Sequence, residues 1–284
     1  MRSISQYLSL GMIAVAVNAC ERPTGPPSSP ASVLAAARPN ASMSDAVNGG
    51  RLGFYFLPSL VPDPGAFPGT FDATLAPYVN ICALVDQVVG CGDGENLVTL
   101  PFGGDKPGGV SVDASSETYN ANGNKPTLDV GKYRVYVRVP VPVPQTTNTL
   151  QVALGFIDLQ VVSKKKDPVD PGFVGVVEGA PIPVKFRIET NTVARILETN
   201  RVGPRIIPVG RVGFIATVVF DLKGTSITCP TMTWTSSDPA VASVVTGSAP
   251  TIGAVTGIAA GSATITATCR GVSELIAVRI TTPA

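Results

Sequence analysis

Cysteine is the residue type in this chain with the clearest capacity for chemistry. The chain holds Cys20, then Cys82 and Cys91, then Cys229 and Cys269, and it has no histidine. Without histidine, Ser-His-Asp catalysis, Cys-His catalysis and every His-ligated metal site are excluded. The spacing of Cys82 and Cys91 also lacks the Cys-x₂₋₄-Cys form of structural zinc sites. Structural disulfides, which persist in exported proteins, are therefore favoured over metal ligands.

The last four cysteines fall into two local pairs. Four cysteines allow three pairings. We favour Cys82 with Cys91 and Cys229 with Cys269, because each bridge then stays within one domain. By loop-closure entropy these bridges would contribute about 3 and about 4 kcal/mol to stability.

The N-terminus predicts an export signal. Arg2 precedes an apolar run, Tyr7–Val17, that is too short to span ~30 Å of hydrocarbon as a helix. The segment Val17-Asn18-Ala19-Cys20 resembles a bacterial lipobox. This resemblance implies that Cys20 is diacylated on sulfur and becomes the mature N-terminus. The alternative is ordinary cleavage after Ala19, which would release a secreted protein.

Two acidic loops are candidates for calcium binding. Asp86, Asp93 and Glu95 flank the first cysteine pair, and Asp167 and Asp170 follow the basic run Lys164–Lys166. Neither loop matches the Asp-x-Asp-x-Asp-Gly pattern that gathers oxygen ligands around calcium. We therefore expect no metal site and no cofactor, and we interpret the basic run as a solvated turn.

Charge and composition separate the remaining function classes. The formal net charge is +1, which disfavours nucleic acid as a partner because phosphate binding needs a basic excess. A chain with no histidine and few acids disfavours an enzyme with its site in residues 50–190. Tyrosines such as Tyr119 and Tyr136 could stack on sugars if exposed, whereas most tyrosines here are expected to be strand residues packed against their neighbours. Carbohydrate binding is thus the main alternative, and a row of solvent-facing aromatics would favour it.

The elements that position these residues are predicted to be strands. Alternating apolar and polar residues recur along the chain, and no segment of ten or more residues keeps a helical period. Pro140, Pro142 and Pro144 are expected to end the strand before them, since proline cannot donate to a ladder. The strands expected in the first part are 52–57, 79–84, 110–113, 132–139, 154–162, 173–177 and 183–189.

The chain is long enough for about two domains. We expect an all-β protein of two β-sandwich domains after a disordered tether. The predicted units are a signal peptide at 1–19, a lipid-anchored disordered linker at 20–49, a β-rich domain at 50–190 and a second domain at 191–284.

The second domain carries several linked motifs. They are Thr233–Ala242, which contains Trp-Thr-Ser-Ser-Asp-Pro, then Gly253–Gly257, Ala259–Gly261 and Ala263–Ala267. Together they resemble the bacterial Ig-like domain, group 2. The resemblance implies a sandwich of about seven strands on bacterial surface or secreted proteins, often in adhesion or as a spacer, with no catalytic residues.

Trp234, the single tryptophan, is expected to fill the core of this domain. Gly253, Gly257 and Gly261 are expected at tight or positive-φ turns. The Cys229–Cys269 bridge is not part of the family pattern.

These observations predict a non-enzymatic lipoprotein of the cell envelope, at the outer membrane or cell surface, acting in adhesion or as a spacer. Its expected partners are the membrane, through the acylated Cys20, and a surface polysaccharide or another surface protein.

Overall fold

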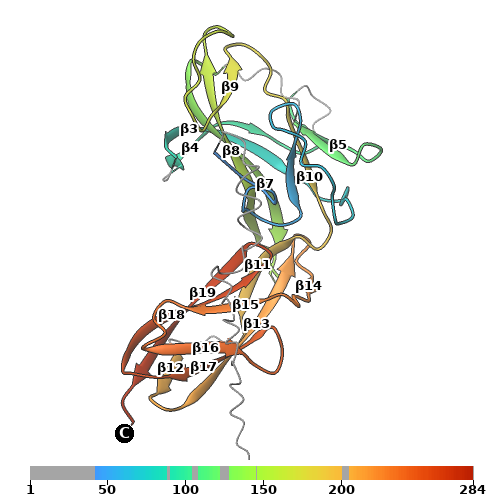
Figure 1. The fold of residues 1–284 in the computed structure, drawn as a ribbon. Helices are drawn as coiled ribbons and strands as arrows, with labels where there is room; N and C mark the ends of the chain where they lie inside the picture. Colours follow the sequence, from blue (N-terminus) through green and yellow to red (C-terminus); the bar gives the residue numbers. More distant parts are fainter. Residues whose placement is uncertain are drawn as a thin grey trace, which may run out of the picture.

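The structure, a computed structural model, describes residues 42–87, 90–103, 108–121, 128–144, 146–199 and 205–283. Cys20, the predicted signal peptide and most of the predicted linker lie outside these residues. Every regular element in the described ranges is a β-strand, which confirms the predicted all-β class. Within those ranges no helix is long and apolar enough to cross a membrane. Figure 1 shows two bodies of sheet lying end to end, which we call the first body (β1–β10) and the second body (β11–β19).

Two sheets face each other in the first body. The larger sheet has the strand order β1-β8-β7-β3-β4, with β9 paired to β8, and the smaller has the order β2-β10-β6-β5. All pairs are antiparallel except β8 with β9. The strands are β1 Met43–Ser44, β2 Phe54–Leu57, β3 Tyr78–Asp86, β4 Gly90–Leu100, β5 Val110–Asp113, β6 Thr118–Ala121, β7 Gly131–Pro142, β8 Thr149–Val162, β9 Val174–Val177 and β10 Val184–Ile188.

The core of the first body lies between these sheets. Alternate residues of β7, from Tyr133 to Val141, are buried, as their period of two predicts. The smaller sheet contributes a cluster of aromatic rings, in which Phe54 packs edge-on against Phe56 and lies 6.0 Å from Phe186. Large rings from one sheet and β-branched side chains from the other thus fill the interior.

Tyr119 is fully buried in this core. Its ring stacks on Phe186 with the centroids 5.4 Å apart, and its hydroxyl donates to the carbonyl of Asp72 at 2.5 Å. Burial raises the pKa of this phenol. The prediction that Tyr119 offers an exposed ring for sugars is therefore wrong, because its position on β6 turns the side chain inward.

The prolines after Arg138 do not end β7 where the sequence predicts. The strand continues through Pro140 to Pro142, paired with β8. The pairing with β3 stops at Arg138, so β7 has an open side beyond that residue. A proline whose nitrogen faces an open side removes no ladder hydrogen bond.

The folded part also begins before the predicted end of the linker. β1 pairs with β8, and the buried carboxylate of Asp45 accepts the backbone amides of Asn48 at 3.0 Å and Phe56 at 3.1 Å. The predicted linker 20–49 is therefore too long at its C-terminal end. A two-residue strand is too short to show alternation in the sequence.

A strand runs through the glycine-rich residues Gly92–Gly94, a composition that is typical of turns. β4 runs through these residues and pairs with β3 through several register shifts. Such shifts let a glycine-rich stretch stay in a ladder without regular pairing.

The second body is also built from two sheets. Their strand orders are β11-β13-β17-β16, with β14 paired to β13, and β12-β19-β18-β15. β12 pairs with β19 in parallel. The strands are β11 Val193–Glu198, β12 Arg205–Pro208, β13 Val212–Asp221, β14 Ser226–Ile227, β15 Thr233–Ser236, β16 Ala242–Thr246, β17 Ile252–Gly257, β18 Gly261–Cys269 and β19 Val272–Thr281.

Trp234 of β15 is buried between these two sheets. Its indole Nε1 donates to the carbonyl of Pro250 at 2.9 Å, and its ring packs on the backbone of Gly253 in β17. A Cβ at Gly253 would lie 2.6 Å from Cε3 of the ring. Gly253 is therefore required by the close approach of the ring. The prediction of tight or positive-φ turns at three glycines holds only in part. None of the three has a positive φ, and Gly253 lies inside β17. Gly257 ends β17 and Gly261 begins β18, on either side of the short connection between these strands.

The β13 strand is apolar on both of its faces. Ile215 and Val219 point into the core. The residues that alternate with them point outward and are also apolar: Phe214, Ala216, Val218 and Phe220. The second sheet differs, because its outward positions on β18 are Ser262 and threonines.

Adding one methyl group at Gly253 tests the packing of Trp234. We expect Gly253→Ala to lower the free energy of unfolding by about 1–3 kcal/mol, because the ring has to move away from the new Cβ. Urea unfolding followed by the fluorescence of Trp234 measures this change. Thr266→Ala, on the outward face of β18, is the control and should stay within about 0.5 kcal/mol of the wild type. Equal stabilities for the two variants would contradict the packing.

Candidate functional site

The two bodies meet at a hairpin turn. Residues 189–192 lead from β10 to β11, and beside them the β18–β19 hairpin turns at Arg270 and Gly271, whose φ values are +48° and +81°. Positive φ at both central residues is typical of a two-residue hairpin turn. The amide of Leu52 donates to the carbonyl of Arg270 at 3.2 Å, and the guanidinium of Arg270 donates to the carbonyl of Asn191 at 3.1 Å. The turn of the second body is thus docked on the first.

The docked turn leaves no room for a side chain at Gly271. A Cβ at this position would overlap the carbonyl oxygen of Gly50, and the positive φ excludes most other residues. The disulfide between Cys229 and Cys269 ends directly before the turn, with the two Cα atoms 6.2 Å apart. It therefore fixes the base of the hairpin that reaches the first body.

Arg51, which lies in the first body, forms hydrogen bonds to both bodies. Its Nη1 donates to the carbonyls of Val193 and Ala194, the latter at 3.1 Å, and its Nη2 donates to the carbonyl of Ala153 at 3.2 Å. Val193 and Ala194 begin β11, whereas Ala153 lies in β8. Burial lowers the pKa of Arg51 to about 10, so the guanidinium still carries its charge at neutral pH. One side chain thus crosslinks a strand of each body.

Two hollows are lined by the docked turn. The first, which we call the junction cavity, has a volume of about 400 Å³ and includes Tyr55, Glu189 and Arg270 in its wall. The second, which we call the aromatic hollow, has a volume of about 270 Å³ and includes Arg51, Tyr136, Phe156 and Gly271. Interfaces between domains are common places for ligands.

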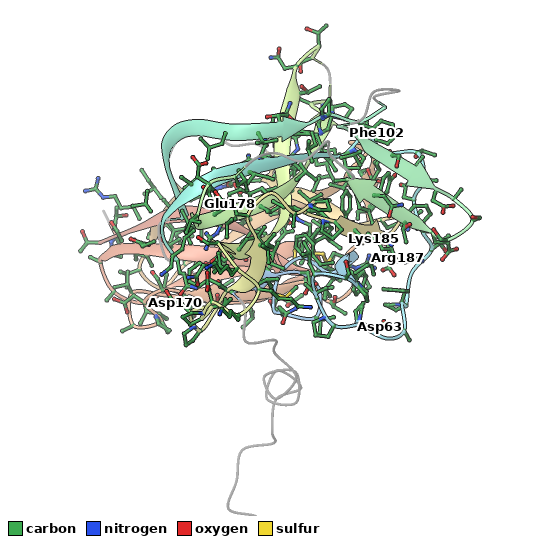
Figure 2. The ribbon with its side chains drawn as sticks, turned by 90° about the horizontal axis from the view of Figure 1, so that it is seen from above. Asp63, Phe102, Asp170, Glu178, Lys185 and Arg187 are labelled. Carbon is green, nitrogen blue, oxygen red and sulfur yellow. A yellow bond between two sulfur atoms is a disulfide. The ribbon has the colours of Figure 1, made fainter. Side chains whose placement is uncertain are left out.

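The junction cavity holds Glu189 as the single carboxylate among its described lining residues. This carboxylate accepts the amide of Gly69 at 2.9 Å and lies 3.9 Å from Nε of the buried Arg187. Arg187 also forms an ion pair with Glu117 and stacks on the ring of Phe67. Figure 2 shows Arg187 on the same strand as the exposed Lys185. Glycoside hydrolysis needs two carboxyl groups across the scissile bond, and this described wall provides one.

Tyr55 adds a buried phenol to the same cavity. Its ring packs edge-on against Phe67, with the centroids 5.1 Å apart. Burial, followed by the nearby charge of Glu189, raises the pKa of Tyr55 to about 12. The phenol is therefore neutral at physiological pH and acts as a structural group.

The aromatic hollow contains a cross-strand ring pair. Tyr136 of β7 and Phe156 of β8 are direct partners, with ring centroids 6.1 Å apart. The guanidinium of Arg134 lies 3.9 Å from the Phe156 centroid and forms two hydrogen bonds to Asp158, at 2.6 and 2.9 Å. Arg138 lies 5.0 Å from the Tyr136 centroid. Arginines thus flank both half-buried rings, which leaves little open ring face.

Both disulfides of the local pairing are present. Cys82 and Cys91 join β3 to β4, with the Cα atoms 5.9 Å apart, and Cys229 and Cys269 form the second bridge. Each disulfide therefore lies within one body, as the local pairing predicts. Cys20 lies outside the described residues.

The two carboxylates of the second acidic loop have partners of their own. Asp167 accepts the amide of Lys164 at 2.9 Å, and Asp170, labelled in Figure 2, forms an ion pair with Lys132 at 2.6 Å. Asp86 is exposed at the end of β3. The side chains of Asp93 and Glu95 lie outside the described residues. In the part of the chain that is described, no three potential metal-ligating residues gather.

The residues of the junction are not among those that we predicted from the sequence. Arg270 and Gly271 do carry a signal, because a residue pair with glycine between two alternating runs indicates a tight hairpin. Arg51 carries none, because its carbonyl partners in β11 lie more than 140 positions further along the chain.

Removing the Arg51 side chain tests the crosslink. We expect Arg51→Ala to lower the free energy of unfolding by about 1–3 kcal/mol, because carbonyls at a partly buried junction lose a charged donor. Scanning calorimetry should then resolve two transitions, one for each body. Arg211→Ala is the matched control, since Arg211 is exposed, and a similar loss in both variants would contradict the crosslink.

Alkaline pH tests the burial of Tyr55. The phenol ionises near pH 10 in the unfolded chain and near 12 in the folded one, so stability falls as pH rises through this range. Tyr55→Phe should reduce that fall by about 1–2 kcal/mol between pH 9 and 11.5, measured by urea unfolding. Part of the fall should persist, because burial also raises the pKa of Tyr119. An unchanged slope would show that Tyr55 is solvated.

Comparisons with solved structures give matches of low similarity. Solved structures similar to the chain include domains 4 and 5 of the S-layer protein SbsC, with 14% identity over 71% of this chain and 94% of that one, and a TM-score of 0.28. They also include extracellular domains 3–5 of Drosophila OTK, with 11% identity over 82% and 60% of the two chains and a TM-score of 0.22. These TM-scores are too low to carry an argument about fold or function. No curated protein sequence matches the chain.

The family comparison is more specific, although it covers only part of the chain. Residues 217–275 match the bacterial Ig-like domain (group 2), from within β13 into β19. This range contains Trp234 and the Cys229–Cys269 bridge. The second body is therefore similar to a bacterial Ig-like domain.

Proposed function

We propose that the chain is an exported, lipid-anchored surface protein without enzymatic activity, in which the two bodies form one stiff spacer that presents an adhesion surface. The observation that carries this proposal is the interlocked junction. Arg51 reaches from the first body to β11, and the Arg270–Gly271 turn reaches back to the first body. A spacer transmits position only if its parts cannot swing freely, and these contacts hold the bodies in one arrangement.

Export is supported by the cysteines. One disulfide lies in each body, and such bonds persist in oxidising compartments. The similarity of residues 217–275 to a bacterial Ig-like domain agrees with a surface location. In this proposal Cys20 carries the lipid, and the chain between Cys20 and β1 connects the membrane to the first body.

The absence of an enzymatic role is supported by the two hollows. The carboxylate of Glu189 is held by the amide of Gly69 and faces the charge of Arg187. It is thus committed to structure, and the cavity wall offers it no second described acid. A carbohydrate-binding role has less support, because Tyr119 is buried and the rings of the aromatic hollow are flanked by arginines.

Cys20→Ala tests the anchor. The wild-type chain should pellet with membranes, and its intact mass should exceed that of the processed polypeptide by the acyl groups. The Cys20→Ala chain should do neither, because it lacks the sulfur that is acylated. Cys229→Ala serves as the control, since it removes a different cysteine and should leave membrane partition unchanged. A wild-type chain that is unacylated and found in the medium would overturn the lipoprotein proposal.

A further inference from the structure

The turn between β13 and β14 of the second body enters the first body. Asp221 at the end of β13 pairs with Val193, the first residue of β11, so this turn lies at the end of the second body that meets the first (Figure 1). Leu222 in the turn is 3% exposed, and it packs in the apolar core of the first body and not in that of the second. A residue of the second body therefore completes the core of the first.

The next two residues of the turn also contact the first body. Nζ of Lys223 lies 2.9 Å from Oδ2 of Asp72, a buried residue of the first body. Gly224 has a φ of +75°, and a Cβ at this position would lie 2.9 Å from the carbonyl oxygen of Pro142 in β7. An apolar contact, an ion pair and a close backbone approach thus involve three successive residues.

Hydrogen bonds within the turn hold these residues in a fixed arrangement. Oδ1 of Asp221 accepts the amides of Lys223 at 2.9 Å and Thr225 at 2.8 Å. The amide of Gly224 donates to the carbonyl of Asp221 at 3.1 Å. The carboxylate of Asp221 is thus used inside the turn, and the turn presents Leu222 and Lys223 to the first body.

This contact is separate from the one at the Arg270–Gly271 turn. That turn lies against Gly50, whereas the β13–β14 turn lies against Pro142 and Asp72. Each contact point that lies away from the others further restricts rotation of one body against the other. The β13–β14 turn therefore adds to the stiffness of the junction.

We propose that the β13–β14 turn is an acid-sensitive latch between the two bodies, in which Leu222 closes the core of the first body and the closure depends on the ionised carboxylate of Asp72. When this carboxylate takes up a proton from solvent, the ion pair with Lys223 is lost and the turn is released. As regulation of the proposed spacer, this step rests on that proposed function.

The surroundings of Asp72 set the direction of the pH dependence. Burial opposes its ionisation, but hydrogen bonds from Thr74 and Lys223 outweigh burial and hold the pKa of the Asp72 carboxyl below its ordinary value. Such a group stabilises the folded state above its unfolded pKa of about 3.9, and this contribution is lost as the pH falls through the lowered pKa. The latch is therefore closed at neutral pH and opens in acid, below about pH 4.

The other titratable groups around Asp72 do not replace Lys223. Tyr119 of β6 donates its hydroxyl to the backbone carbonyl of Asp72, and burial raises the pKa of this phenol, so it is neutral in acid and at neutral pH. On the adjacent β10 segment, Arg187 and Glu189 face each other with Nε and Oε1 3.9 Å apart. Among the described residues, Lys223 is thus the cation paired with Asp72.

Hydrogen exchange of the full chain, measured by mass spectrometry, tests the shared core. Leu222→Ala should raise the exchange rates of amides in β7 and β10 by about 10-fold or more, because a substitution in the second body leaves a cavity in the core of the first. Leu275→Ala replaces a 65% exposed leucine of the same body and should leave these rates within about 2-fold. The fluorescence of Trp234 checks that each variant is folded. An increase confined to the second body, or no increase, would overturn the proposal.

Charge variants test the acid sensitivity by the same measurement. At pH 7, Asp72→Asn, which mimics the protonated carboxyl, and Lys223→Met should each raise the exchange rates in β7 and β10 by about 3-fold. Lys185→Met, which removes an exposed lysine of β10, is the control and should leave them unchanged.

The difference between the wild type and Asp72→Asn should disappear below about pH 4, where the wild-type carboxyl is protonated as well. A difference that persists in acid, or charge variants that match the wild type at pH 7, would overturn the acid-sensitive latch. Neither measurement involves acylation or adhesion, so failure of the latch is distinguishable from failure of the proposed surface function.

Discussion

The arrangement of the two bodies depends on the hydrogen bonds that the guanidinium of Arg51 donates. Arg51 is placed by the segment that leads into β2, and it donates to carbonyls at the start of β11 and in β8. Removing a charge from water costs less free energy when its donors are hydrogen-bonded, so the Nη1 and Nη2 bonds of Arg51 favour the geometry in which both strands reach it. The Arg270–Gly271 turn closes the same junction from the other body. These contacts hold the first body and the second body in one relative orientation.

Much of the strand pattern could be predicted, because alternation reports which residues share a face. The buried column of β7 from Tyr133 to Val141 and the threonine column of β18 follow directly from the sequence. Alternation does not say which face meets the core when both are apolar. β13 shows this limit, since Ile215 and Val219 point inward although the column of Phe214 and Phe220 has the larger rings.

The candidate site was much less predictable than the fold. Local pairing of the cysteines is readable because short loops bring their ends together at low entropic cost. The junction is built instead from contacts between residues far apart in the chain, such as Arg51 with Ala194. The requirement for glycine at position 253 could not be predicted either, because it arises from the ring of Trp234 on another strand. Tyr119 was misplaced because a short strand gives few residues from which to assign a face.

The parallel pairing of β12 with β19 has a mechanical consequence. These strands run in the same direction, with Arg205 beside Val278 and Pro208 beside Thr281. A pulling force applied between the entry to the second body and the far end of β19 would slide the two strands along each other. It would therefore load their backbone hydrogen bonds together, in shear, instead of breaking them one after another. The second body thereby gains resistance to extension without any additional core.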